Sequence, residues 1–283
     1  MSALMDNEFA NDALILIAHG STINTQSSAS TRALVEAIRG RSIFSEVACA
    51  FKLEEPKIEE VPNLVNSQRV FAVPVSISEG QFTEEIVPLH LGLRAESESE
   101  YSRKGKIKGK ELIYCKPVGT HFSMTSVILS KAVDIVREYP FPNMPRSEET
   151  TLIIAGHGTQ QSANSRKAIE DQVELARARN DYFEVLPAFM EESPLIGECL
   201  EVARSRYVII VPFFISDGLH TIEDIPVLLG EPANRVRARI ESNQPTWRNP
   251  TERKGKLVWY TKAIGNEPNL PEVVLDRVRE AAQ

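Results

Sequence analysis

The chain consists of two copies of one sequence, and this internal duplication restricts its fold more than any other feature. A shift of 138 residues (14 to 152) brings the first copy onto the second, and beyond Gly92 the shift grows to 146 residues (110 to 256). The matching segments are Leu14–Ser21 with Leu152–Thr159, Val70–Gly80 with Val208–Gly218, and Lys110–Gly119 with Lys256–Gly265. A period of this length indicates a duplicated domain, because solenoid repeats are shorter.

The domain organisation follows from this duplication. A chain of 283 residues is long enough for two domains that each bury a core. Between the copies, the segment Pro140–Pro145 contains three prolines, which cannot continue a helix and favour a stiff connector. We therefore expect a first unit at 1–140, a linker at 141–149 and a second unit at 150–283.

The apolar pattern predicts the fold class. Short apolar runs closed by small residues are typical of buried parallel strands, and here they alternate with segments of helical periodicity. In the first copy the expected strands are 14–18, 47–52, 70–76 and 111–115, and the expected helices are 27–39, 56–65, 80–92 and 126–138. We therefore expect an α/β protein with two tandem doubly wound domains, each with a four-stranded parallel sheet and helices on both faces.

Composition excludes several classes of partner. A net charge of −7 argues against nucleic acid, and the basic segment 103–110 reads as a solvated loop. The apolar runs are too short to span a bilayer, and the first residues carry no signal-peptide pattern. The cysteine count of three is odd and the cysteines are scattered, which favours reduced thiols. We expect a cytoplasmic protein with no membrane partner.

Two histidines are the most chemically specific feature of the sequence. His157 follows the first expected strand of the second copy, and His220 follows the third. Ligands of doubly wound sheets bind beyond the carboxyl ends of the strands, so both imidazoles should reach one crevice. Neutral imidazole binds the later first-row divalent metals and also accepts protons near neutral pH. A metal or acid–base site is therefore expected on the second copy.

The first copy retains only half of this pair. His19 matches His157, but Phe82 matches His220. Three carboxylates of the first unit lie close to Phe82 in the sequence and could supply a metal ligand across the interdomain cleft: Glu79, Glu84 and Glu85. The alternative is that these are helix-starting acids, which favour the positive end of the helix dipole.

These motifs resemble the class II tetrapyrrole chelatases, specifically the CbiX or SirB type of sirohydrochlorin chelatase in its long, two-unit form. The resemblance is carried by Leu152–Gly158 with its copy Leu14–Gly20, and by the stretch from Val211 to Pro226 with its Gly-x-His and Asp-Ile-Pro elements. It implies a lyase that inserts Co2+ or Fe2+ into sirohydrochlorin, in cobalamin or siroheme biosynthesis. It also implies that the metal is a substrate and that no tightly bound cofactor is needed.

The resemblance further implies roles for individual residues. His157 and His220 would be the catalytic, metal-holding pair. The macrocycle would lie in the interdomain cleft, where the substrate-binding residues would be His19, Phe82, Arg166, Lys167, Phe213 and Phe214. The sequence departs from the two-domain cobalt chelatases at Phe82, where those proteins carry an acidic residue.

Two other functions stay open at this stage. One is a non-catalytic tetrapyrrole or metal carrier descended from a chelatase, in which Phe82 marks the lost activity. The other is a metallohydrolase that uses the histidines with carboxylates near His220, namely Asp217, Glu223 and Asp224. The sequence does not choose Co2+ over Fe2+, and both a monomer and a homodimer are compatible with the internal duplication.

Overall fold

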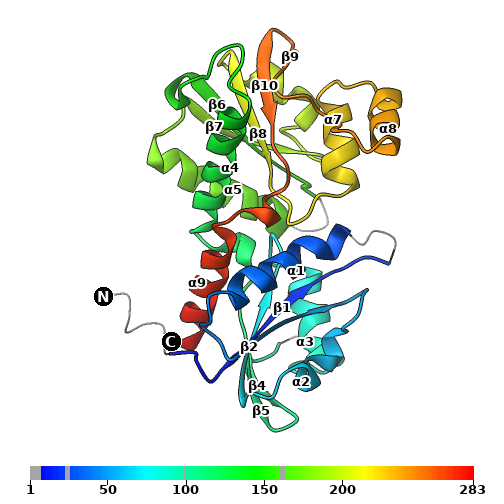
Figure 1. Cartoon of the computed structure of the whole chain (residues 1–283), viewed down its shortest axis with the longest axis vertical. Helices are drawn as coiled ribbons and strands as arrows, with labels where there is room; N and C mark the ends of the chain where they lie inside the picture. Colours follow the sequence, from blue (N-terminus) through cyan, green and yellow to red (C-terminus); the bar gives the residue numbers. More distant parts are fainter. Residues whose placement is uncertain (1–7, 23–25, 99, 160–162) are drawn as a thin grey trace. The chain divides into compact units, whose positions relative to one another are not determined.

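The described residues form two β-sheets with the same strand order, and helices pack on both of them (Figure 1). The computed structural model describes residues 8–22, 26–98, 100–159 and 163–283. The strands of the first sheet are β1 (Ala13–Ala18), β2 (Glu46–Phe51), β3 (Arg69–Pro74), β4 (Lys104–Ile107) and β5 (Lys110–Tyr114), in the order β2-β1-β3-β5-β4. The strands of the second are β6 (Thr150–Gly156), β7 (Glu184–Phe189), β8 (Tyr207–Pro212), β9 (Thr251–Arg253) and β10 (Lys256–Tyr260), in the order β7-β6-β8-β10-β9.

The α/β class and the doubly wound parallel arrangement are confirmed, but the expected four strands are one too few. Each sheet carries a fifth, antiparallel edge strand, β4 or β9, joined to its neighbour by a tight turn. In the first sheet this turn is Lys108 and Gly109, both with positive φ (46° and 85°), as two-residue hairpins require. The basic segment 103–110 is therefore a hairpin and not a loop. Its lysines protect an exposed sheet edge from pairing with other chains.

The helices alternate with the strands as the pattern predicted, although two of them are interrupted. Helix bounds are α1 (Gln26–Arg39), α2 (Val61–Leu64), α3 (Val87–His90), α4 (Met124–Glu138), α5 (Ala163–Arg179), α6 (Cys199–Val202), α7 (Ile225–Leu228), α8 (Ala233–Glu241) and α9 (Leu270–Ala282). The expected helices at 56–65 and 80–92 are each shorter than predicted, because Pro62 and Pro88 lack the amide hydrogen that a continuous helix needs and so stand in the first turn of α2 and α3. Short turns precede them: 3₁₀ at Ile58–Glu60 and π-helical at Gln81–Ile86.

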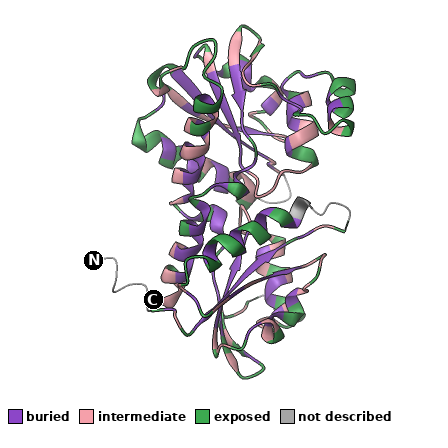
Figure 2. Cartoon of the chain, viewed as in Figure 1, coloured by how far each residue is buried: buried purple, intermediate pink, exposed green. Residues whose placement is uncertain are grey.

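The core of each unit lies on both faces of its sheet. Every residue of β1 and of β6 is buried, since each strand is central and covered on both sides (Figure 2). In the first unit Ile15 and Ile17 pack with Val61 and Val87 from the short helices. Burying an aliphatic side chain of this size contributes about 1.5–3 kcal/mol. No helix within the described ranges is both long enough and apolar enough to cross a bilayer.

The two compact units do not coincide with the two sequence repeats, because each unit contains the last helix of the other repeat. One unit consists of 1–123 with 268–283, and the other of 124–267. Helix α4, which ends the first repeat, packs on β8 and α5 of the second unit, and α9 packs on α1 and β3 of the first. The predicted linker at 141–149 lies between the two sequence repeats. The compact units, which are defined by their internal contacts, instead meet along the chain after residues 123 and 267. Below, unit 1 and unit 2 denote these compact units.

Candidate metal site

The two imidazoles of unit 2 come from neighbouring parallel strands. β6 pairs with β8 in parallel register, so the carboxyl ends of both strands lie at the same edge of the sheet. His157 directly follows β6, and His220 begins the π-helical turn His220–Asp224 after β8. Gly158 permits the sharp departure of the chain, since its φ is +59° and an added Cβ would come within 2.7 Å of the Phe189 Cβ.

The two histidine rings lie close together in an edge-to-face arrangement. Their centroids are 5.0 Å apart and the ring planes meet at 78°. The side chain of His157 is 34% exposed and that of His220 is 48% exposed, so both are accessible from solvent. The structure thus brings together the pair that the sequence singled out, and the role of the pair as metal ligands stays a prediction.

Each ring has its Nδ1 atom engaged by a neighbouring oxygen. His157 Nδ1 lies 3.1 Å from the carbonyl oxygen of Gly158, and His220 Nδ1 lies 2.7 Å from Asp224 Oδ2. Because a carbonyl oxygen and a carboxylate both accept hydrogen bonds, Nδ1 is the donor in each contact. In the neutral ring this leaves Nε2 with its lone pair, which is the arrangement found for metal-binding histidines.

A carboxylate that the sequence reasoning missed lies beside this pair. Glu191 Oε1 lies 3.6 Å from His157 Nε2. Glu191 follows β7, and β7 is the other neighbour of β6, so three adjacent strands deliver Glu191, His157 and His220 to one edge. Within the described part of the chain, however, no three His, Cys, Asp or Glu side chains already form a complete metal site. Glu191 would therefore have to turn toward the metal.

The residue types of this group differ between the two copies. At a shift of 138 residues, Glu191 matches Leu53 and Asp224 matches Ile86, in addition to the match of His220 with Phe82. Unit 1 therefore keeps only His19 from this group and carries apolar side chains at the other three places. The Phe82 ring packs against His19 with a centroid distance of 5.3 Å.

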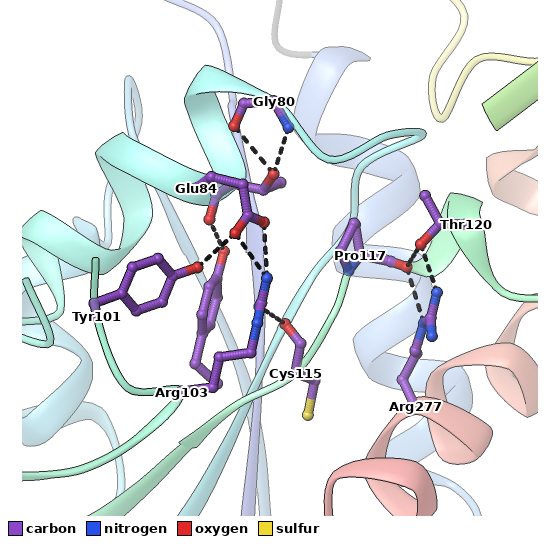
Figure 3. A network of polar contacts seen from close by, with 10 residues as sticks. Gly80, Glu84, Tyr101, Arg103, Cys115, Pro117, Thr120 and Arg277 are labelled. Atoms are coloured by element: carbon purple, nitrogen blue, oxygen red, sulfur yellow. Dashed lines mark hydrogen bonds and ion pairs between the residues drawn. The ribbon is translucent and has the colours of Figure 1, made fainter. Parts of the chain in front are cut away.

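The three acidic candidates of unit 1 differ in their surroundings. The carboxylate of Glu84 accepts two hydrogen bonds from Arg103 Nη2 (2.9 and 2.8 Å) and one from the Tyr101 hydroxyl (2.7 Å), as Figure 3 shows. This network gives Glu84 a structural role within unit 1. For Glu79 and Glu85 the prediction of a metal contact stands.

The residues predicted to contact the substrate differ in their exposure and in the ion pairs that they already form. Phe213 is only 1% exposed and packs in the interior, so it offers no face to a ligand, whereas the partly exposed Phe214 ring lies 6.0 Å from His220. Arg166 is paired with Glu170 and Glu192, and Lys167 with Asp171. A contact of Arg166 or Lys167 with substrate carboxylates would compete with these partners, and it stays a prediction.

The fold and the pair of neighbouring imidazoles are those of a chelatase-like α/β protein, and the metal-binding role of the pair stays a prediction. The chain belongs to the CbiX family, whose sequence model matches 13–135 and again 151–281. A protein of Halobacterium salinarum named probable sirohydrochlorin cobaltochelatase is 33% identical over 279 residues, which cover 95% of this chain and 91% of that protein. A sirohydrochlorin cobaltochelatase of Methanopyrus kandleri is 30% identical over 138 residues, covering 46% of this chain and 95% of that protein.

Solved structures share the fold. DR2241 from Deinococcus radiodurans, a multi-domain protein with structural similarity to chelatases, matches with a TM-score of 0.72 and 24% identity, covering 96% of this chain and 54% of that one. SirB from Bacillus subtilis, solved with Fe3+, matches with a TM-score of 0.67 and 18% identity, covering 96% and 95%. The Methanopyrus relative is about as long as one repeat, whereas the Halobacterium relative and SirB are covered almost throughout by both repeats.

Proposed function

We propose that the protein is a sirohydrochlorin chelatase, a lyase that inserts Co2+ or Fe2+ into the macrocycle. The observation that carries the proposal is the pair of neighbouring imidazoles, His157 and His220, each with Nδ1 held by an oxygen and Nε2 left to bind a metal. The relatives named sirohydrochlorin cobaltochelatase support the activity. The SirB structure solved with Fe3+, and another of SirB from Bacillus subtilis subspecies spizizenii in complex with cobalt, support the metals. We place the reaction in the cytoplasm, in cobalamin or siroheme biosynthesis.

In this proposal the metal ion is a substrate that unit 2 holds before transfer. His157 and His220 supply two nitrogen ligands, and Glu191 supplies an oxygen ligand after a rotation of its side chain. Insertion of a divalent ion into the free macrocycle releases two protons from pyrrole nitrogens. Glu191, His157 and His220 lie close together at this edge and would serve as the bases that accept those protons.

The macrocycle would lie over the carboxyl edge of the unit 2 sheet. Phe214 is partly exposed beside His220, and Leu219 is 65% exposed directly before it in sequence. These apolar side chains suit one face of a flat ring system. We retain His19, Arg166 and Lys167 as candidates for contacts with the rim of the macrocycle.

An anaerobic absorbance assay tests the proposal. Sirohydrochlorin is mixed with Co2+, and separately with Fe2+, in the presence and absence of the protein. Spectral conversion faster than the uncatalysed rate is the expected result, and the two rates rank the metals. A shifted spectrum without conversion would contradict the proposal and favour the carrier. Hydrolysis of generic esters with added Zn2+ and no insertion would favour the hydrolase.

A further inference from the structure

The two units also differ in the space beside the end of β5 in unit 1 and of β10 in unit 2, and this space is filled in unit 1. There the Glu84 carboxylate, the Tyr101 phenol and the Arg103 guanidinium form one network (Figure 3). Arg103 also donates to the carbonyl oxygen of Cys115, and its guanidinium lies 5.1 Å from the centre of the Tyr114 ring. Together these side chains occupy the space beside the end of β5.

Unit 2 keeps the tyrosine that borders this space but lacks the side chains that fill the space in unit 1. The hydroxyl of Tyr260 donates to the carbonyl oxygen of Thr221 at 2.7 Å, as Tyr114 does to its counterpart in unit 1. At the repeat shifts of 138 and 146, however, the carboxylate, the phenol and the guanidinium are replaced by Ile222, Trp247 and Asn249. Asn249 instead binds the backbone of Tyr260. No ion pair can form among the replacements.

A cavity of about 650 Å³ lies at this place in unit 2. Its lining includes Ile222, Trp247 and Asn249 themselves, together with α4 residues and the segment that follows α8. That segment belongs to the connection that is eight residues longer in the second repeat (146 minus 138). The volume falls within the range of pockets that bind small molecules.

Two buried polar atoms of the lining have no hydrogen-bond partner among the described residues. They are Glu267 Oε2 and Trp247 Nε1. The Glu267 side chain is 6% exposed, and Lys131 donates to its other oxygen only, at 2.8 Å. Trp247 is 5% exposed. Buried polar groups are costly to leave unpaired, so a ligand that reaches these two atoms would gain one acceptor and one donor.

The charge of the lining favours a cation. Four carboxylates face two ammonium groups, namely Asp134, Glu138, Asp217 and Glu267 against Lys131 and Lys262. This balance disfavours anions, including a tetrapyrrole with rim carboxylates. Within the described ranges no three His, Cys, Asp or Glu side chains are clustered as metal ligands, here or at the histidine pair, so the choice of an organic cation rests on the aromatic lining.

The filled space in unit 1 indicates the shape of such a cation. Arg103 places its planar guanidinium over the rings of Tyr101 and Tyr114, at 5.7 and 5.1 Å. Unit 2 keeps an aromatic pair at the same places, with the Trp247 and Tyr260 centroids 6.0 Å apart, and the Arg253 guanidinium already lies 5.7 Å from the centre of the Trp247 ring. Cations bind favourably over aromatic faces, and Trp is the strongest of these platforms.

We propose that this cavity of unit 2 binds a small organic cation with a guanidinium or primary ammonium head, held by Glu267 and the Trp247–Tyr260 aromatic pair. The ligand takes the place that the Arg103 side chain fills in unit 1. Because Thr221 and Ile222 line the cavity, an occupant touches the turn on which His220 lies. The proposal does not depend on the chelatase activity.

Calorimetric titration of the whole protein with agmatine, and separately with succinate, tests the proposal. We expect one agmatine site with a dissociation constant below about 1 mM and no binding of succinate. The double variant Ile222→Glu/Asn249→Arg introduces the counterparts of Glu84 and Arg103, with Trp247 still in place of Tyr101, and should weaken agmatine binding at least tenfold. Glu267→Gln, which keeps the shape and removes the charge, should weaken it about tenfold.

The control variant is His157→Ala, which lacks one of the two proposed metal ligands and should still bind agmatine like the native protein. The agmatine result therefore stands even if the chelatase assay fails. Absence of agmatine binding at about 10 mM would overturn the proposal and leave a water-filled cavity. Equal binding by the native protein, the double variant and Glu267→Gln would also overturn it. Tighter binding of succinate than of agmatine would show that the cavity prefers anions and would overturn the proposal.

Discussion

Asp224 is predicted to set the orientation of His220 without touching the metal. Its Oδ2 atom lies 2.7 Å from His220 Nδ1, one turn further along the same π-helical segment. Asp224→Ala removes this acceptor and frees the imidazole to rotate or to exchange its tautomer. The Nε2 lone pair is then no longer held in one direction.

The size of the effect follows from the exposure of the contact. Loss of an outer-sphere partner of a metal-binding histidine costs 10- to 100-fold in affinity or activity. The two side chains are 48% and 44% exposed, so solvent weakens the pair, and we expect the lower end. A tenfold loss corresponds to about 1.4 kcal/mol. The stability of the fold should change by less than about 1 kcal/mol, as for other exposed pairs.

The assay is Co2+ affinity by competition with a chromophoric chelator, together with kcat/KM for insertion. Glu223→Ala is the matched control, because it removes one carboxylate from the same turn, and Glu223 pairs with Arg237 at 3.0 Å rather than with His220. Asp224→Asn should fall between the two, since its amide oxygen still accepts from Nδ1. Equal losses in Asp224→Ala and Glu223→Ala would refute the orientation argument and leave only a charge effect.

Three further predictions concern unit 1. Leu53→Glu combined with Phe82→His restores the metal-site residue types around the retained histidine and should raise the Co2+ stoichiometry from one to two, measured by calorimetry. Arg103→Ala leaves the half-buried Glu84 without its main donor and should lower the free energy of unfolding by about 1–2 kcal/mol in urea titrations. Burial lowers the pKa of His121, so the unfolded chain binds the proton more readily, and stability should fall as the pH drops below about 6.5. Replacing His121 by Gln should flatten that dependence.

Each of these has an outcome that would contradict it. A stoichiometry that stays at one would show that unit 1 lacks more than two ligands. Urea midpoints for Arg103→Ala equal to those of the exposed control Arg137→Ala would deny the Glu84 network a structural role. An unchanged pH slope in His121→Gln, with His19→Gln as the control, would assign the acid sensitivity to other groups.

The sequence predicted the α/β class and the histidine pair because both depend on local pattern and on a general property of parallel sheets. The fifth strand was missed, since a lysine-rich segment shows no apolar alternation and forms a strand only through its pairing with β5. Glu191 was missed because its importance depends on the strand order β7-β6-β8, which local pattern does not contain.

The remaining differences come from tertiary packing. Phe213 and Phe214 are adjacent and equally apolar, but only the structure shows that the first lies in the core and the second beside His220. Helix α4 has an amphipathic face that would suit either sheet, and its packing on β8 is decided by partners distant in sequence. Unpaired groups such as Glu267 Oε2 are likewise visible only once the chain is folded.

The most direct test of the central claim, that unit 2 carries the chemistry, compares His157→Ala with its repeat counterpart His19→Ala in the sirohydrochlorin insertion assay. The two variants remove the same side chain from equivalent positions of the two units. The account predicts that kcat falls at least about 100-fold in His157→Ala, equivalent to about 2.7 kcal/mol, and stays within about threefold in His19→Ala. Similar losses in both variants, or a larger loss in His19→Ala, would contradict it.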